Sequence, residues 1–230
     1  HYLDPHADYK THAGGPSFGT GARDLYDGEV AFTDKHIGRL LDHVGRQPYA
    51  GKTTIIVTSD HGEAFGEHKM YRHGFEVWEV LVRVPLIVYV PGQTPSRITA
   101  RRSLIDLVPT MLEAMNVPLP PHRDKAALDS FDFVSGHSLL ADVFNPTPQT
   151  APNRDIVVDM PAGPYNGARR AFIHGDLKLI ISGGAAKELY DLKIDPQESR
   201  NVWRKRRKEI EARYALAKRQ LREITVKKRR

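Results

Sequence analysis

The run from Thr53 to Ser59 limits what this chain can fold into more than any other segment. It consists of β-branched and apolar residues without polar alternation, which is typical of a strand buried on both faces of a parallel sheet. The preceding segment, Arg23 to Val44, carries apolar residues at helical spacing and predicts an amphipathic helix. A helix followed by such a strand predicts an α/β fold. The solvent face of this helix is expected to carry Asp27, Glu29, Asp34, Lys35 and Asp42.

Two further segments extend this prediction. Arg83 to Val90 has the composition of a second buried strand, and Ser103 to Met115 predicts a helix that Pro109 either bends or starts. Together with the first helix and strand, they predict a mostly parallel sheet flanked by helices.

Prolines accumulate between residues 121 and 152, and we interpret this segment as a loop that connects two domains, 1–120 and 153–230. Short β-rich runs separated by glycine-containing turns follow it, which predicts a small antiparallel sheet. The chain then ends in a basic helix. The expected strands are 156–159, 170–174, 177–182 and 188–192, and the expected helix is 202–226.

Composition excludes several classes of site. The sequence contains no cysteine, which excludes disulfides, thiolate metal ligands and a cysteine nucleophile in this chain. Its longest apolar stretch, Val84 to Val90, is interrupted by Pro85 and is far shorter than a membrane span of about 20 residues. A transmembrane helix is therefore not expected here.

The basic charge is concentrated in residues 204–230, which contain 13 Lys and Arg against three Glu, although the whole chain carries only +6. This segment could contact an anionic membrane surface. The alternative, which we favour, is a terminal helix that packs by one apolar face and keeps its charges in water. Nucleic-acid binding is not expected, because no interleaving of aromatic residues with the basic ones and no binding motif accompanies the charge.

Asp60 and His61 directly follow the first buried strand. Ligands bind at the carboxyl ends of strands in open α/β sheets, so this pair predicts half of a divalent-cation site. The alternative is that Asp60 caps a helix and His61 is a surface residue. Gly62 and a second His-Gly pair, His73-Gly74, favour the site, because they lie in a loop without a hydrophobic stripe.

Five motifs in order resemble the sulfatase branch of the alkaline phosphatase superfamily. They lie between residue 1 and about residue 202, so the resemblance covers most of the chain. It implies a partial alkaline-phosphatase-like fold, with residues 1–120 as the C-terminal part of the catalytic domain. The motifs are Pro5-His6 followed by Tyr9, Tyr26-Asp27-Gly28-Glu29, Thr58 to Glu63 with Gly66-Glu67-His68 and His73-Gly74, Arg83 to Ile87, and Glu188 to Leu192 with Asp195-Pro196.

The resemblance implies a metal site and a set of catalytic residues. Asp60 and His61 would ligate the metal, with Ca²⁺ as the first expectation. Mn²⁺ or Zn²⁺ are the alternatives, because the imidazole of His61 suits them better. His6 would hydrogen-bond the oxygens of the ester, and His73 would steady the leaving-group oxygen.

Other polar residues of this region are assigned smaller roles. Lys69 and Arg72 would add positive charge for substrate binding, although a solvent-exposed role is equally open. His68 is interpreted as a loop-ordering residue. His12, like the histidines without chemical neighbours elsewhere in the chain, is interpreted as structural or surface.

The family's nucleophile is absent from these 230 residues. Sulfatases carry a formylglycine made from Cys or Ser in a Cys/Ser-x-Pro-x-Arg motif, and this motif does not occur here. The resemblance therefore implies a truncated sulfuric ester hydrolase, inactive as it stands, whose substrate is a small-molecule or glycan sulfate ester. A phosphate, phosphodiester or phosphonate enzyme of the superfamily and a non-catalytic module with the same fold remain alternatives. The family also implies an extracytoplasmic, periplasmic or membrane-anchored, location.

Overall fold

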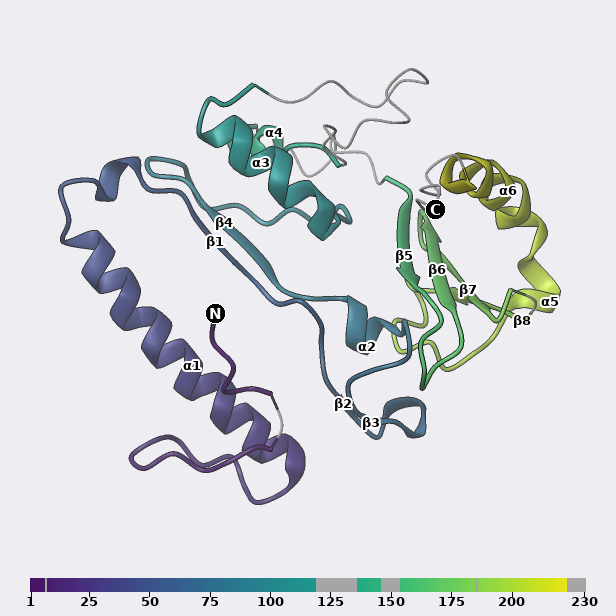
Figure 1. Ribbon diagram of the computed structural model, residues 1–230, viewed down its shortest axis with the longest axis horizontal. Coiled ribbons are helices and arrows are strands. Elements are labelled where there is room, and N and C mark those ends of the chain that lie inside the picture. The colour runs from purple at the N-terminus through teal and green to yellow at the C-terminus, as the bar shows by residue number, and fades with distance from the viewer. Residues whose placement is uncertain (7, 119–135, 146–153, 185, 223–230) are drawn as a thin grey trace, which may run out of the picture. The chain divides into compact units, whose positions relative to one another are not determined.

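The structure is a computed structural model that describes residues 1–6, 8–118, 136–145, 154–184 and 186–222 (Figure 1). The chain forms two compact units. The first unit consists of residues 1–74 and 84–92, and the second of 75–83 and 93–230. The connecting loop predicted at 121–152 lies largely outside the described residues, so the domain limits stay a prediction.

A long helix and a pair of strands form the frame of the first unit. The helix α1, Ala22–Gly45, confirms the helix predicted from apolar spacing. The short 3₁₀ helix η1 leads from it into strand β1. The remaining elements of this unit are η1 Ala50–Lys52, β1 Ile55–Thr58, β2 Ala64–Phe65, η2 Glu67–Lys69, β3 Tyr71–Arg72 and β4 Leu86–Tyr89.

The predicted direction and burial of the two apolar strands are wrong. Strands β1 and β4 pair antiparallel, with Ile55 opposite Tyr89 and Thr58 opposite Leu86. A parallel pair needs a crossover, usually a helix of a dozen residues or more in its connection, and the only α-helix between these strands has four residues. The strands are also half-buried at best, since Ile87 remains 60% exposed.

One residue of α1 does not lie where helical periodicity puts it. Glu29 was expected on the solvent face, but it is only 3% exposed. The segment before the helix covers it: the Lys10 backbone N–H donates to Glu29 Oε1 at 2.7 Å. Periodicity describes one helix and cannot show which chain segment folds over it.

The second unit is built on an antiparallel sheet of four consecutive strands, as the sequence predicted. Each strand pairs with the next along the chain, and Gly175 forms the tight turn between β6 and β7 with a positive φ of 57°. The bounds are β5 Ile156–Met160, β6 Arg169–His174, β7 Leu177–Ser182 and β8 Ala186–Asp191.

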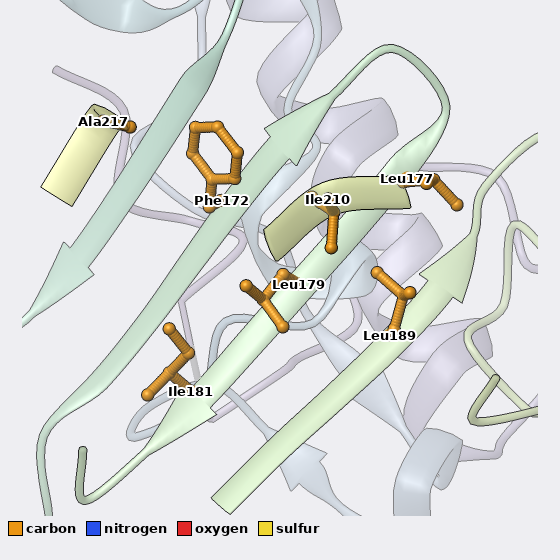
Figure 2. Packing of buried hydrophobic residues seen from close by; sticks show 7 residues of the cluster. All are labelled: Phe172, Leu177, Leu179, Ile181, Leu189, Ile210 and Ala217. Carbon is orange, nitrogen blue, oxygen red and sulfur yellow. The ribbon is translucent and has the colours of Figure 1, made fainter. Parts of the chain in front are cut away.

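Apolar side chains cover both faces of this sheet. On one face, Phe172, Leu179 and Leu189 meet Ile210 of the C-terminal helix, as Figure 2 shows. A second cluster is made of Val77, Ala171, Ile173, Ile180, Tyr190 and Leu192. Alternation along the strands thus supplies two separate cores.

The basic C-terminal segment packs by one face, as favoured above. It forms α5, Trp203–Arg206, and α6, Lys208–Arg222. Ile210 and Ala217 of α6 are buried at helical spacing, while Arg213 pairs with Asp155 at 2.6 Å. Contact of residues 204–230 with an anionic membrane stays a prediction, and residues 223–230 lie outside the description.

Shorter helices complete the second unit. Pro109 is the third residue of α3, in the first helical turn, where it removes no intrahelical hydrogen bond. Part of the expected connecting loop is helical instead, because buried Leu139 and Leu140 anchor it. No helix in the described part of the chain is both long and apolar enough to cross a membrane. The bounds are α2 Glu79–Val82, η3 Leu104–Asp106, α3 Leu107–Ala114 and α4 Leu140–Phe144.

Candidate active site

The end of β1 is fixed by two side-chain hydrogen bonds. The Thr58 hydroxyl donates to the Pro85 carbonyl at 2.8 Å, which ties the strand end to the segment that enters β4. The Ser59 hydroxyl donates to the His61 carbonyl at 2.6 Å. These two hydrogen bonds fix the turn that carries Asp60 and His61, one to the segment before β4 and one within the turn itself.

Asp60 and His61 present two adjacent metal donors. His61 Nδ1 lies 2.9 Å from the Gly62 carbonyl, and since a carbonyl only accepts, Nδ1 carries the proton. The lone pair is then on Nε2, which lies 4.0 Å from Asp60 Oδ2. Metal bonds of about 2.0 to 2.4 Å to both atoms span that separation. The pair fits a divalent metal as two of its ligands.

This pair alone does not complete a metal site. Within the described ranges, no third His, Asp or Glu joins Asp60 and His61 in a group close enough to hold an ion. A divalent metal needs at least four donors, including water. A metal bound by Asp60 and His61 would therefore need further donors from outside this pair.

A small hairpin carries His73 back towards the strand end. Strands β2 and β3 pair with Ala64 opposite Arg72, so the register continues to place Glu63 opposite His73. Gly66 turns the chain between them with a φ of 122°, a backbone conformation that suits glycine. Two short strands and their turn thus decide where His73 lies.

Glu63 holds the ring of His73. Its carboxylate is only 4% exposed and accepts from His73 Nδ1 at 3.0 Å. A carboxylate that fixes Nδ1–H leaves Nε2 as the nitrogen that can exchange a proton. The sequence motif contains Glu63 but does not show that this residue is the partner of His73. Only the register of the short hairpin pairs the two residues, and strands of two residues leave no pattern of that register in the sequence.

Three predicted histidines meet next to Asp60. The rings of His61 and His73 are stacked with centroids 4.4 Å apart. The rings of His6 and His73 lie 4.7 Å apart. Segments that are distant in sequence are thus brought together within the first unit. The catalytic and metal-binding roles of these residues stay predictions.

Lys69 and Arg72 lie on the same hairpin but point their charges to its surface. Arg72 Nη2 donates to Asp8 Oδ1 at 2.9 Å, and both side chains are more than half exposed. Lys69 is exposed on η2. Their contribution to substrate binding stays a prediction.

Tyr9 adds a buried hydroxyl to this region, and sequence reasoning gave it no role. Its ring packs against Tyr26 and Phe65 with centroids 5.6 and 5.9 Å away. Its hydroxyl has no well-formed hydrogen bond among the described residues. Burial raises the pKa of Tyr9, and the nearby Glu63 carboxylate raises it further. The hydroxyl therefore stays protonated and can donate.

The profile of one protein family matches residues 1–117, about half of the chain, and that family is Sulfatase. The chain belongs to the sulfatase family. Its predicted recognition from five ordered motifs is thereby confirmed. The matched segment includes Asp60 and the three histidines that meet next to it, His6, His61 and His73, which we call the histidine group.

Curated relatives agree with this assignment. The sulfatase chain is 29% identical over 193 residues to arylsulfatase K of Mus musculus, with 78% of this chain and 32% of the relative covered. The chain spans about a third of the length of the curated relatives it matches.

Solved structures confirm the predicted alkaline-phosphatase-like α/β fold. One is a protein in complex with its substrate, D-glucosamine-2-N,6-O-disulfate. It is 26% identical, has a TM-score of 0.66, and the match covers 88% of this sulfatase chain and 40% of that chain. The phosphonate monoester hydrolase of Agrobacterium radiobacter matches at 22% identity with a TM-score of 0.67, over 88% and 41% of the two chains.

Proposed function

We propose that this chain supplies the metal-binding and proton-donating side of a sulfuric ester hydrolase. The observation that carries the proposal is the meeting of His6, His61 and His73 beside the Asp60 carboxylate. A pair of metal ligands and two further imidazoles in one place can stabilise the negative charge of a transferring sulfuryl group.

Each residue of the group has a separate task in this proposal. His6 donates a hydrogen bond to an oxygen of the sulfuryl group. His73, oriented through Nδ1 by Glu63, gives the proton on Nε2 to the departing alkoxide oxygen. A divalent metal held by Asp60 and His61 would neutralise charge on the sulfuryl oxygens. Ca²⁺ is the first candidate, and Mn²⁺ and Zn²⁺ are the alternatives that an imidazole ligand favours.

The nucleophile and further metal donors must be supplied from outside these 230 residues. The chain contains no Cys/Ser-x-Pro-x-Arg motif in which formylglycine could form. We therefore propose that the chain is the C-terminal portion of a longer hydrolase and is inactive alone. An upstream sequence without that motif would favour a non-catalytic module instead.

A sulfated glycan or small sulfate ester is the proposed substrate class. It is supported by the 26% identical structure solved with a glucosamine disulfate. A second candidate function is hydrolysis of phosphate or phosphonate esters. The imidazole of His61 favours it, because this donor suits Mn²⁺ or Zn²⁺ better than Ca²⁺, the ion expected first for a sulfatase. The extracytoplasmic location stays a prediction.

The test uses the longer protein that carries this chain, assayed with an aryl sulfate, an alkyl sulfate and an aryl phosphate. His73→Gln should lower kcat/KM by about 10² to 10⁴, as expected for loss of a general acid. The loss should be larger for the alkyl sulfate, because its poor leaving group depends more on the proton. His43→Gln, on the exposed side of α1, is the matched control and should leave kcat/KM unchanged.

Three results would contradict the proposal. Equal losses for the aryl and alkyl sulfates would remove His73 as proton donor. Turnover of the aryl phosphate without turnover of either sulfate would replace sulfate by phosphate chemistry. Hydrolysis of the aryl sulfate by the 230-residue chain alone would end the claim that the nucleophile lies outside it.

A further inference from the structure

A second group of possible metal ligands lies in the first unit. Asp4, His12 and Glu29 each offer one donor atom, and the three atoms all lie within 4.8 Å of one another. None of the three belongs to the histidine group around Asp60. We call Asp4, His12 and Glu29 the triad.

The charge of the triad is out of balance. Glu29 is 4% exposed at its side chain, and its carboxylate lies 2.5 Å from His12 Nε2. Asp4 adds a second, half-buried carboxylate to the same space. One protonated imidazole can neutralise only one of two neighbouring carboxylates. A divalent cation between the three donor atoms would balance the second carboxylate.

The imidazole is held in a fixed orientation. The ring of His12 stacks on the ring of Phe32, with the ring centroids 3.7 Å apart and an interplanar angle of 8°. Glu29 is held in turn, because the Lys10 N–H donates to its other oxygen at 2.7 Å. Metal-binding residues are typically oriented by such neighbours before the ion arrives. Thr33 follows Glu29 by one helical turn. Its buried hydroxyl has no hydrogen-bond partner among the described residues, so it is an unused polar group on the same helix as Glu29.

We propose that the triad binds a divalent transition-metal ion, Zn²⁺ first and Mn²⁺ next. Two carboxylate oxygens and one imidazole nitrogen are three protein ligands of the type these ions take, with a water in the remaining position. The ion displaces the proton shared by His12 and Glu29, so its uptake releases a proton. The proposal does not depend on the proposed function.

Binding at the triad would also fix the segment in front of α1. Asp4 and His12 lie on either side of His6 in the sequence, while Glu29 belongs to the helix. An ion that joins all three would tie the segment containing His6 to α1. An ion at the triad would thereby order the segment that carries His6.

The experiment measures Zn²⁺ binding by isothermal titration calorimetry in a protein that carries Asp60→Asn and His61→Gln. These two changes remove the other donor pair, so any remaining tight binding belongs elsewhere. We expect one Zn²⁺ per chain and a heat that varies with the ionisation enthalpy of the buffer, which reports the released proton. Adding His12→Gln should weaken binding more than about tenfold.

Matched variants keep the result interpretable. Asp4→Asn should also weaken Zn²⁺ binding more than about tenfold, and it decides the matter if His12→Gln fails to fold by circular dichroism. Asp8→Asn, a change to an exposed carboxylate on the same segment, should leave the affinity unchanged. Affinity within twofold of the background for folded His12→Gln or Asp4→Asn overturns the proposal. Absence of Zn²⁺ binding in the background protein does so too, and it would show His12 and Glu29 to be a hydrogen-bonded pair only.

Discussion

The two units of this chain bury charge in opposite ways. In the second unit, fully buried Lys178 lies 2.9 Å from both Glu79 and Glu198, inside a sheet whose two faces are covered by apolar side chains. In the first unit, the buried charges are the carboxylates of Glu29 and Glu63, and each meets a histidine.

The two kinds of buried pair suit different roles, one in stability and the other in chemistry. Lysine and glutamate ordinarily carry opposite charges across the physiological pH range, so a pair of them suits a permanent core. A histidine held by a carboxylate can gain or lose a proton, or bind a metal, near neutral pH. The buried carboxylates of the first unit thus meet groups that can exchange a proton, whereas those of the second unit meet a lysine that holds strand and loop segments together.

The largest effect is expected from removing the lysine of the second unit. Lys178→Ala leaves two carboxylates without their buried partner and should lower the free energy of unfolding by about 3 to 5 kcal/mol. Both tryptophans, Trp78 and Trp203, lie in this unit, so urea unfolding followed by their fluorescence reports it directly. Lys193→Ala, at an exposed position, is the control and should change little.

The pH dependence sharpens this prediction. Burial raises the pKa of Glu198 above its usual value, while Lys178 lowers it. Removing the lysine raises the pKa of Glu198 further. A carboxyl with a raised folded-state pKa costs stability above that pKa and regains it as pH falls towards the unfolded value. The deficit of Lys178→Ala should therefore shrink in acid, and a deficit that stays constant or grows would contradict the assignment.

A smaller effect, on activity and not on stability, is expected from Glu63 in the first unit. In the longer protein, Glu63→Gln should lower kcat/KM for an aryl sulfate by about 10- to 100-fold, because His73 loses the carboxylate that orients its ring. Tryptophan-detected unfolding of the second unit should not change. The ring-nitrogen NMR shifts of His73 should show the proton leaving Nδ1 in part of the population.

Glu63→Asp is the matched variant, since it keeps the charge on a shorter side chain and should recover part of the activity. If Glu63→Gln retains kcat/KM within twofold, or if its histidine tautomer is unchanged, Glu63 is a structural residue only. The first unit would then resemble the second in how it uses a buried carboxylate.

The sequence predicted those features that depend on local pattern. Apolar spacing predicts α1 and the strands of the second unit, and the order of motifs points to Asp60, His61 and His73. These features need only neighbouring residues or a family resemblance.

Features that depend on how distant segments meet could not be predicted. The burial of Glu29 requires the segment around Lys10 to fold over α1, which no helical pattern reveals. The pairing of Glu63 with His73 depends on strands of two residues, too short to show alternation. The antiparallel direction of β1 and β4 depends on the path of their connection. All three features lie in the first unit.

The smallest effect is expected at the exposed edge of the first unit. Ile87 of β4 is 60% exposed, so Ile87→Thr, which keeps a β-branched side chain, should change local stability by no more than about 0.5 kcal/mol. The tryptophans do not report this unit, and hydrogen exchange of the β1 and β4 amides is the suitable measurement. Val88→Thr, at the next and less exposed position, should cost more. A loss above about 2 kcal/mol at Ile87 would mean that its face of the strand pair is covered in the folded protein.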